Sequence, residues 1–344
     1  MSISILFGGK SYEHEISIVS AISLSKIINF THFIFLDPSH EFYLIPQEKM
    51  NSKTFSSLEY KQCKKLLLKQ GDFYISSFFT EKALGVRKLL SVVHGGDGED
   101  GILSSLLEFY SIPFIAPRTS ACVLSFDKHL TKLFAKERGV RVLDYEVYDR
   151  KMAPKTLTQY PSIIKPLRLG SSIGVGIARD KESLEYLLDS AFEYDHRILV
   201  EPFIEGVKEY NLAGYKNLEG EFVFSVVEEP KKEEFLNFEN KYLDFSRTST
   251  LSQAQITKEL EKKLQEAFRI LYDNCFEGAI IRCDFFVIDD EVYLNEINPI
   301  PGSMANYLFL DFAHVLDDVG IPSPKTIDVN YTYIHKIQKA KGKA

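Results

Sequence analysis

Polar side chains recur at every second position in two neighbouring segments near the end of the chain. Arg282 and Asp284 alternate with apolar residues in the first segment, and Glu296 and Asn298 do so in the second. Because side chains of a β-strand alternate between its faces, each pair projects from one face. The acidic connection at 289–290 is short enough for a hairpin, which places Asp284 opposite Glu296 to within about one residue. The sequence therefore predicts a cluster of oxygen atoms with a fixed cation beside it.

Such a cluster favours metal-assisted phosphate chemistry. Mg²⁺ in proteins is commonly held by one or two carboxylates together with substrate phosphates. The alternative is a solvated polar face on a half-buried hairpin. That alternative explains poorly why the polar face is confined to the end next to residues 299–302, Pro-Ile-Pro-Gly.

Composition limits the class of protein. A chain of 344 residues, 45% hydrophobic and 26% charged, is long enough for two or three globular domains. The net charge of −7 gives no electrostatic footprint for nucleic acid or an anionic membrane. The start of the chain has no signal-peptide pattern, no later run is long and apolar enough to span a membrane, and the four cysteines and eight histidines show no disulfide or zinc spacing. We therefore expect a soluble cytoplasmic protein with reduced thiols and with no nucleic-acid or membrane partner.

The first third of the chain has a βαβ opening. Apolar periodicity predicts strands at 3–7 and 32–36 around a helix from about Glu13 to Ile28, and later a strand at 89–93 followed by a helix. Residues 40–88 alternate between Lys-rich and aromatic stretches without a dominant period, and we assign no structure to them. The expected first domain is α/β and spans 1–116.

Two further domains are expected, at 117–205 and 206–344. The first begins with a helix that ends at Gly139, and the second contains longer strands, a polar loop and an amphipathic helix around residues 260–271. Between Gly139 and residue 206 the sequence predicts one helix near 182–192 and strands at 140–148, 162–166, 174–178 and 198–204.

Three segments resemble known motifs but lack the required context. The run 96–101 matches the dinucleotide fingerprint, yet three carboxylates in its turn would repel a pyrophosphate. The run 170–174 matches the hydrolase elbow, but a strand rather than a helix is expected after it. Gly9-Lys10-Ser11 lacks the first glycine of a P-loop.

Residues 165–174 are better explained as a phosphate-binding hairpin. A strand ends in Lys165, and a loop of small residues, Gly170-Ser171-Ser172, leads to a returning strand. Small residues let backbone N–H groups approach phosphate oxygens, and a lysine supplies a point charge. A plain hairpin loop is the alternative, although a lysine among apolar residues requires an anionic partner if it is buried.

Taken together, these motifs resemble the D-alanine–D-alanine ligases of the ATP-grasp superfamily, most closely those of epsilonproteobacteria. They lie along the chain in the order Phe7-Gly8-Gly9, Glu13-His14-Glu15-Ile16-Ser17, His94-Gly95-Gly96-Asp97-Gly98-Glu99-Asp100-Gly101, Lys165-Pro166, Gly170-Ser171-Ser172, Lys241-Tyr242, Arg282-Cys283-Asp284, Asn295-Glu296-Ile297-Asn298 and Pro301-Gly302. The resemblance implies an α/β fold, α+β in part, with three-domain ATP-grasp architecture. A Rossmann-like N-terminal α/β domain would bind substrate, and ATP would lie between the central and C-terminal domains.

The resemblance also implies an activity. These ligases use ATP to join two D-alanines through a D-alanyl phosphate, for peptidoglycan precursor synthesis, with two Mg²⁺ (or Mn²⁺) ions, and a homodimer is expected. A D-alanine–D-lactate ligase is the nearest alternative, and Tyr242 disfavours it because depsipeptide-forming relatives carry histidine in that loop. A nucleotide-binding module without catalysis is the other alternative.

Roles at the nucleotide follow from the same resemblance. Lys128, Lys165 and Lys241 would hold ATP. Glu201 would accept a hydrogen bond from the adenine amino group beside Phe203 and Ile204, and Glu209 would bind the ribose. Asp284, Glu296 and Asn298 would be the metal ligands.

Roles at the amino-acid substrates are implied as well. Glu13 would bind the first ammonium group with His94 nearby, and Arg282 with the Gly302 N–H would form the oxyanion hole. Ser171 and Tyr242 would share a hydrogen-bond network with Glu13.

Structural explanations remain open for several of these residues. Glu13 could simply favour a helix dipole, and His94 could be a satisfied histidine at a strand end. Lys241-Tyr242 could be a solvated surface.

Two positions depart from the common family pattern. Leu169 stands where many relatives have glutamate, so a role for that acid is not expected here. Tyr307 stands where a serine usually contacts the carboxylate of the second D-alanine, a group that the tyrosine hydroxyl could still reach.

Overall fold

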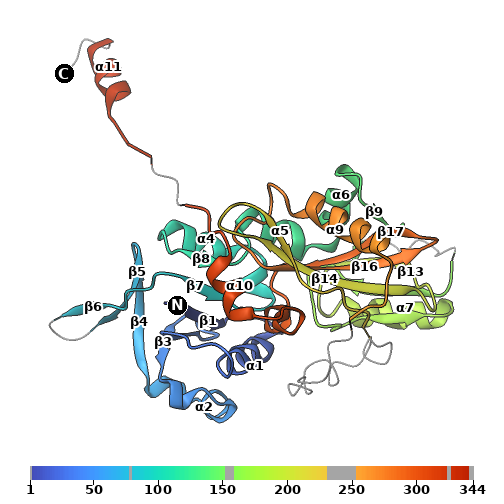
Figure 1. Ribbon diagram of the computed structural model, residues 1–344, viewed down its shortest axis with the longest axis horizontal. Helices are drawn as coiled ribbons and strands as arrows, with labels where there is room; N and C mark the ends of the chain where they lie inside the picture. Colours follow the sequence, from blue (N-terminus) through green and yellow to red (C-terminus); the bar gives the residue numbers. More distant parts are fainter. Residues whose placement is uncertain (1, 77–79, 152–158, 231–252, 324–326, 341–344) are drawn as a thin grey trace.

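In its described residues, the computed structural model contains three sheets with helices packed around them (Figure 1). The structure describes residues 2–76, 80–151, 159–230, 253–323 and 327–340.

The N-terminal sheet confirms the βαβ opening. Its parallel strands are β2 (Phe33–Leu36), β1 (Ser4–Gly8), β7 (Leu89–Ser91) and β8 (Phe114–Ile115), in that spatial order. Every residue of these strands is buried, as expected for parallel strands covered on both faces. Helix α1 (His14–Leu24) connects β1 to β2 and ends slightly earlier than predicted.

The segment that the sequence left unassigned extends this sheet. Antiparallel strands β3 (Phe42–Ile45), β4 (Lys64–Lys69), β5 (Asp72–Ser76) and β6 (Glu81–Ala83) add to β2 in order, with the short helices η1 (Gln47–Lys49), α2 (Ser52–Ser56) and η2 (Glu59–Gln62) between β3 and β4. In β4 only Leu66 is fully buried. Strands near a sheet edge often carry lysines at exposed positions, and here these lysines obscure the alternation of apolar and polar residues that would predict a strand.

The glycine-rich run after β7 forms a helix rather than a dinucleotide turn. Helix α3 (Gly96–Glu99) is followed by α4 (Ile102–Phe109), α5 (Thr119–Phe126) and α6 (Lys128–Glu137). A Cβ on Gly98 would lie 1.7 Å from the carbonyl oxygen of Val93. This glycine therefore permits close packing of helix on strand.

The middle sheet has the antiparallel order β10 (Glu146–Asp149), β13 (Arg197–Pro202), β11 (Ser162–Pro166), β12 (Gly176–Ala178), and α7 (Lys181–Ala191) packs against it. The strands predicted at 162–166, 174–178 and 198–204 and the helix at 182–192 are confirmed. The single strand predicted at 140–148 is wrong, because β9 (Arg141–Val142) joins the third sheet and β10 the middle one. Val142 and Tyr148 are buried in different apolar cores, a division that alternation alone does not reveal.

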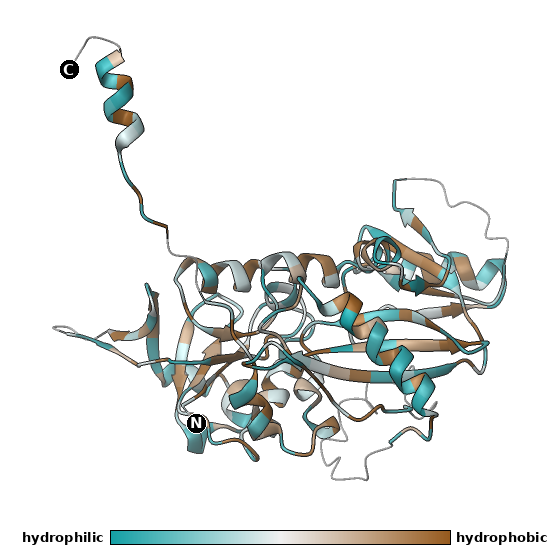
Figure 2. Ribbon diagram, turned by 45° about the horizontal axis from the view of Figure 1, so that its top comes forward, coloured by the Kyte–Doolittle hydropathy of each residue, from teal (hydrophilic) through white to brown (hydrophobic). Residues whose placement is uncertain are grey.

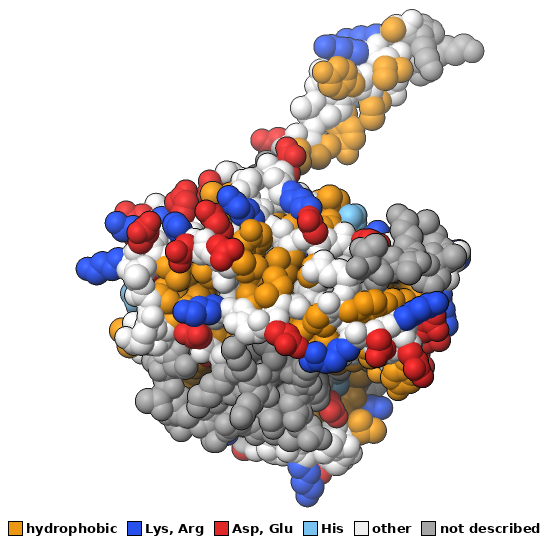
Figure 3. Space-filling model, turned by 90° about the vertical axis from the view of Figure 1, so that its right-hand side faces the viewer, with side chains coloured by type: hydrophobic (Ala, Val, Ile, Leu, Met, Phe, Trp, Pro, Cys, Tyr) orange, Lys and Arg blue, Asp and Glu red, His pale blue; other side chains and the backbone are white. Residues whose placement is uncertain are grey.

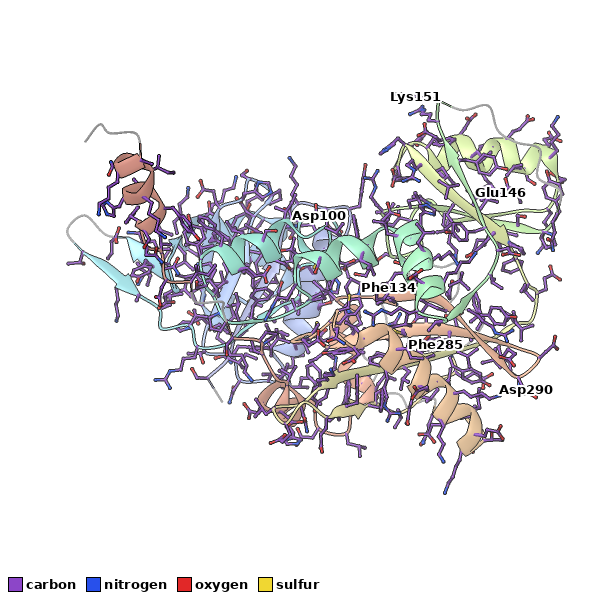
Figure 4. All side chains as sticks on the ribbon, turned by 90° about the horizontal axis from the view of Figure 1, so that it is seen from above. Asp100, Phe134, Glu146, Lys151, Phe285 and Asp290 are labelled. Carbon is purple, nitrogen blue, oxygen red and sulfur yellow. The ribbon has the colours of Figure 1, made fainter. Side chains whose placement is uncertain are left out.

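The third sheet holds the predicted acidic hairpin. Its order is β15 (Phe222–Phe224), β14 (Lys208–Lys216), β16 (Ile281–Ile288), β17 (Glu291–Asn298), β9. Helix α9 (Lys258–Tyr272) covers it, and its teal and brown faces in Figure 2 match an amphipathic helix with a buried apolar side. The turn at Asp289 and Asp290 has positive φ at both residues, which suits the right-handed twist of a tight hairpin. Figure 4 shows the middle and third sheets as separate layers, with Glu146 in one and Phe285 and Asp290 in the other.

The chain ends with η4 (Gly302–Leu308), α10 (Phe312–Asp318) and α11 (Thr332–Ala340). Figures 1 and 3 show α11 standing off the body. No helix in the described ranges combines the length and apolar character needed to cross a membrane. The four cysteines are free thiols, as predicted.

Candidate active site

The strand register of β16 and β17 brings the predicted polar residues together. Asp284 pairs with Glu296 and Arg282 with Asn298. The Arg282 Nε and Nη2 groups donate to the two Asp284 oxygens at 2.6 and 2.8 Å, and Asn298 Nδ2 donates to Asp284 at 3.0 Å. The hairpin and its cluster of oxygen atoms are therefore confirmed.

The facing acids have the chemistry of a cation site. Burial raises the pKa of the Asp284 carboxyl, Arg282 opposes this effect, and the facing Glu296 carboxylate adds to it. A cation between the two acids would offset both the cost of burying their negative charges and the repulsion between them. Within the described ranges, no group of three or more His, Cys, Asp or Glu residues could hold a metal. Two carboxylates and the Asn298 amide oxygen are oxygen ligands of the kind that Mg²⁺ prefers, with phosphate or water oxygens completing its shell.

Three buried charges form a bridge from the middle sheet toward this hairpin. Lys165 Nζ on β11 donates to Glu201 Oε1 at 2.6 Å and to Asn295 Oδ1 on β17 at 3.2 Å. Lys132 Nζ on α6 lies 2.7 Å from Glu201 Oε2. Lys165 therefore has the anionic partner that its burial requires.

The lysines keep Glu201 ionised. Burial acts to raise the pKa of its carboxyl, but Lys165 and Lys132 outweigh burial and lower the pKa to about 2. In this state both Glu201 oxygens lie within ion-pair distance of a protein cation.

Lys128 connects the phosphate loop with the acidic groups. Its Nζ donates to the Leu169 carbonyl oxygen at 2.6 Å. Burial lowers the pKa of Lys128, whereas the carboxylates of Glu296 and Glu13 favour its charged form. Leu169 is buried, so at this position the chain contributes a backbone oxygen and no acidic side chain.

The Glu13 carboxylate lies in a tight cradle. Ser171 Oγ donates to Glu13 Oε1, and Glu13 Oε2 is buried without a hydrogen-bond partner. A Cβ on Gly95 would lie 2.5 Å from Oε2, and one on Gly170 would lie 2.9 Å from Oε1. Burial raises the pKa of Glu13, and nearby Glu99 adds to the effect. An ammonium group is the ligand that such an acid lacks.

His94 lies beside this cradle and is linked through Ser20 to the turn that follows β17. Its Nε2 is 3.1 Å from Ser20 Oγ, and its Nδ1 is 3.7 Å from Glu99 Oε1. The Ser303 N–H donates to Ser20 Oγ at 3.2 Å. Residues Ser303, Met304 and Ala305 have φ values of 46°, 56° and 49°. Three consecutive non-glycine residues in the left-handed region mark a strained turn directly after Gly302.

Tyr307 lies near the arginine but its hydroxyl is engaged elsewhere. The Tyr307 hydroxyl donates to Glu228 Oε2 at 3.0 Å, and Asn211 Nδ2 donates to the same oxygen at 3.0 Å. Burial raises the pKa of Tyr307, while Arg282 lowers it.

The remaining predicted residues follow β13, lie on β14 or fall outside the described ranges. Phe203 and Ile204 are half-buried after β13, and Glu209 on β14 is close enough for its charge to stabilise Lys165. Lys241 and Tyr242 fall outside the described residues.

Three residues at the site were not predicted. Lys132 lies one helical turn after Lys128, and Ser20 lies seven residues after Glu13, so helical spacing could have indicated both. Glu228 has no such signal, because its contact with Tyr307 joins distant parts of the chain.

Comparison with known proteins identifies the family. Residues 2–117 match the family model described as "D-ala D-ala ligase N-terminus", and residues 135–327 match "D-ala D-ala ligase C-terminus". The chain belongs to the D-alanine–D-alanine ligase family. It is 55% identical to the D-alanine–D-alanine ligases of Wolinella succinogenes, over 346 residues, and Helicobacter hepaticus, over 350 residues, with each alignment covering 100% of both chains.

Solved ligase structures share the fold. The crystal structure of the Helicobacter pylori D-alanine–D-alanine ligase matches with a TM-score of 0.81 and 47% identity, covering 92% of this chain and 96% of that one. The VanG D-Ala:D-Ser ligase of Enterococcus faecalis matches with a TM-score of 0.73 and 27% identity, covering 92% and 98%. The three-sheet arrangement is therefore the ATP-grasp ligase fold, as predicted.

The buried Glu201 carboxylate gives a pH-dependent contribution to the stability of this ligase. Its ordinary pKa is 4.5 and its folded value is about 2. Its charge therefore stabilises the fold fully above pH 4.5, and the contribution is lost as the pH falls toward 2. We expect Glu201→Gln to lower the free energy of unfolding by about 3 kcal/mol at pH 7, and by progressively less below pH 4.5, in urea titrations.

The matched control is Glu205→Gln, which removes an exposed acid paired with exposed Arg179. Its effect should be small at every pH. A Glu201→Gln deficit that stays constant or grows as the pH falls would contradict this assignment.

Proposed function

We infer that this chain catalyses the ATP-dependent ligation of two D-alanines to D-alanyl-D-alanine, with release of ADP and phosphate, for peptidoglycan synthesis. The observation that carries the inference is one continuous polar site in a chain of this family. It joins the facing acids Asp284 and Glu296, the buried cations Lys128 and Lys165, and the unpartnered Glu13 oxygen. We propose that the enzyme works in the cytoplasm, because its reaction consumes ATP.

ATP would lie between the middle and third sheets. Lys128 and Lys165 would neutralise its phosphates, and Glu201 would accept from the adenine amino group beside Phe203 and Ile204. Glu209 would bind the ribose, and we assign Lys241 to the phosphates as well. The support is that Lys165 borders both Glu201 and the metal-binding hairpin.

Asp284, Glu296 and Asn298 would hold two Mg²⁺ or Mn²⁺ ions. When bound, such ions neutralise charge on the transferring phosphoryl group, where catalysis is mostly positioning and electrostatics. Arg282 fixes the Asp284 carboxylate through both oxygens, which orients it toward Glu296.

The first D-alanine would bind through its ammonium group to Glu13, with His94 beside it. Its carboxylate oxygen attacks the γ-phosphorus, ADP leaves, and an acyl phosphate forms. Ser171 keeps the Glu13 carboxylate oriented, and we assign Tyr242 to the same network.

The amine of the second D-alanine then attacks the acyl carbon, and phosphate leaves after the tetrahedral intermediate loses a proton. Two of the five N–H donors of Arg282 are engaged by Asp284, so the others can donate to the oxyanion together with the Gly302 N–H. We propose that Tyr307 contacts the second substrate.

The activity is tested by phosphate release. We expect release from ATP to require both D-alanine and Mg²⁺, because the acceptor carboxylate is itself the phosphoryl nucleophile. Replacing D-alanine with L-alanine, or adding EDTA, should reduce the rate to background. Equal release without D-alanine would indicate an ATPase, no release at all would indicate a binding module, and preferential incorporation of D-lactate over a second D-alanine would indicate the depsipeptide ligase.

A matched pair of variants locates the chemistry in the same assay. Arg282→Ala should lower kcat by about 10²–10³. Arg269→Ala removes an exposed arginine on α9 and should leave kcat unchanged. Equal effects of the two substitutions would contradict the role of Arg282.

We also propose that the enzyme is a homodimer that pairs through helices α4–α6. These helices pack against one another and carry exposed apolar side chains: Ile102, Phe109, Val123, Leu130 and Leu133. A row of this kind is typical of a surface covered by a partner.

Light scattering should therefore give a dimer for the wild type and a monomer for Phe109→Lys. Ile27→Lys, at an exposed apolar position on another face, should stay dimeric. A monomeric wild type, or a Phe109→Lys variant that remains dimeric, would contradict this interface.

A further inference from the structure

Lys132 is a buried cation that the proposed mechanism does not use. It lies on α6 with 2% of its surface exposed, and its Nζ lies 2.7 Å from Glu201 Oε2 and 5.5 Å from the Tyr145 ring centroid. Burying an ammonium group is costly even when it is paired, and an apolar side chain would often be at least as stable there. Stability alone therefore gives a weak reason for a lysine at this position.

The two cations on Glu201 differ in what else they can reach. Lys165 also contacts Asn295, and the carboxylates of Glu296 and Glu209 act on it, so it borders the phosphate and metal region. Lys132 lies 2.7 Å from Glu201, and among nearby charges Glu201, Lys165 and Lys136 have the largest effects on it. Phosphate oxygens can therefore attract Lys165 away from Glu201, whereas Lys132 on α6 can stay beside Glu201.

This difference matters when nucleotide binds. If Lys165 turns toward the phosphates, Glu201 loses one of its two countercharges while it stays buried. A buried carboxylate without a countercharge takes up a proton. A protonated acid is a poorer acceptor for the adenine amino group, which is a hydrogen-bond donor.

We propose that Lys132 is a positioning residue for base selection, the permanent countercharge that keeps Glu201 a hydrogen-bond acceptor for the 6-amino group of adenine after Lys165 has moved to the phosphates. The inference rests on the proposed function, in which Glu201 contacts adenine and Lys165 contacts phosphate. Burial acts against the Glu201 charge, and Lys165 and Lys132 together outweigh it and lower the pKa of this carboxyl to about 2.

The test compares ADP with IDP, which has an acceptor oxygen in place of the 6-amino group. Calorimetry on the full chain with Mg²⁺ should show that the wild type prefers ADP. Lys132→Met should weaken the binding of ADP about tenfold and the binding of IDP much less, so that the preference for ADP over IDP becomes smaller. In the ligase assay, KM for ATP should rise with kcat at saturation within about twofold.

The matched control is Lys136→Met. Lys136 lies one turn further along α6, with its Nζ 5.2 Å from the same Tyr145 ring, but its side chain is 47% exposed. This variant should keep the wild-type preference for ADP. Lys132→Arg, which conserves the charge, should also keep it. If Lys132→Met does not fold, Lys132→Gln keeps a donor to Glu201 without the charge and should show the same loss of preference.

The outcomes separate this inference from the proposed function. A wild type that does not distinguish ADP from IDP would mean that Glu201 does not read the adenine amino group. The role of Lys132 alone would be overturned if the wild type prefers ADP but Lys132→Met keeps this preference. It would also be overturned if Lys132→Met weakens the binding of ADP and IDP by the same factor.

Discussion

The register between β16 and β17 is the constraint on which the site depends. A shift of one residue would move every side chain of β17 to the opposite face of the sheet. Asp284 would then no longer face Glu296, and Asn298 would no longer lie beside Arg282. The two-residue turn at 289–290 and the buried apolar residues of both strands hold the pairing as far as Phe285 with Leu294. A one-residue irregularity between Phe285 and Asp284 then brings Asp284 opposite Glu296, so the cluster of oxygen atoms depends on the turn and on this irregularity together.

Charge pairing then links this hairpin to the other two sheets. Lys165 connects the middle sheet to β17 through Asn295, and Lys128 interacts with acids from both the hairpin and the N-terminal helix region. Glu13 meets the phosphate loop through Ser171. Removing one member of such a buried pair is costly, but replacing all its members with apolar side chains is often neutral or stabilising, because desolvation offsets most of the attraction. Their arrangement is better explained by the need to bind a charged nucleotide and a zwitterionic amino acid side by side.

Local patterns predicted part of this structure well. Alternation gave the hairpin with Asp284 opposite Glu296, and apolar runs gave the βαβ opening, because both signals lie within a few residues. Residues 40–88 could not be assigned, since strands near the sheet edge such as β4 are half-exposed and lack a clean period. The prediction of one strand at 140–148 was wrong because the two ends of this segment are buried in different apolar cores. Roles for Glu13 and Glu201 and the contact of Ser171 with Glu13 came from family resemblance, whereas Lys132, the second partner of Glu201, required the folded chain.

The central claim is that the register of β16 and β17 assembles a metal and phosphate site. Electron paramagnetic resonance of Mn²⁺ in the presence of ADP tests it most directly, with Asp284→Asn, Glu296→Gln and, as a control, Glu291→Gln at the exposed far end of β17. We predict that each of the first two substitutions weakens Mn²⁺ binding by at least about tenfold and that the control does not. Unchanged Mn²⁺ affinity in either Asp284→Asn or Glu296→Gln would contradict the account.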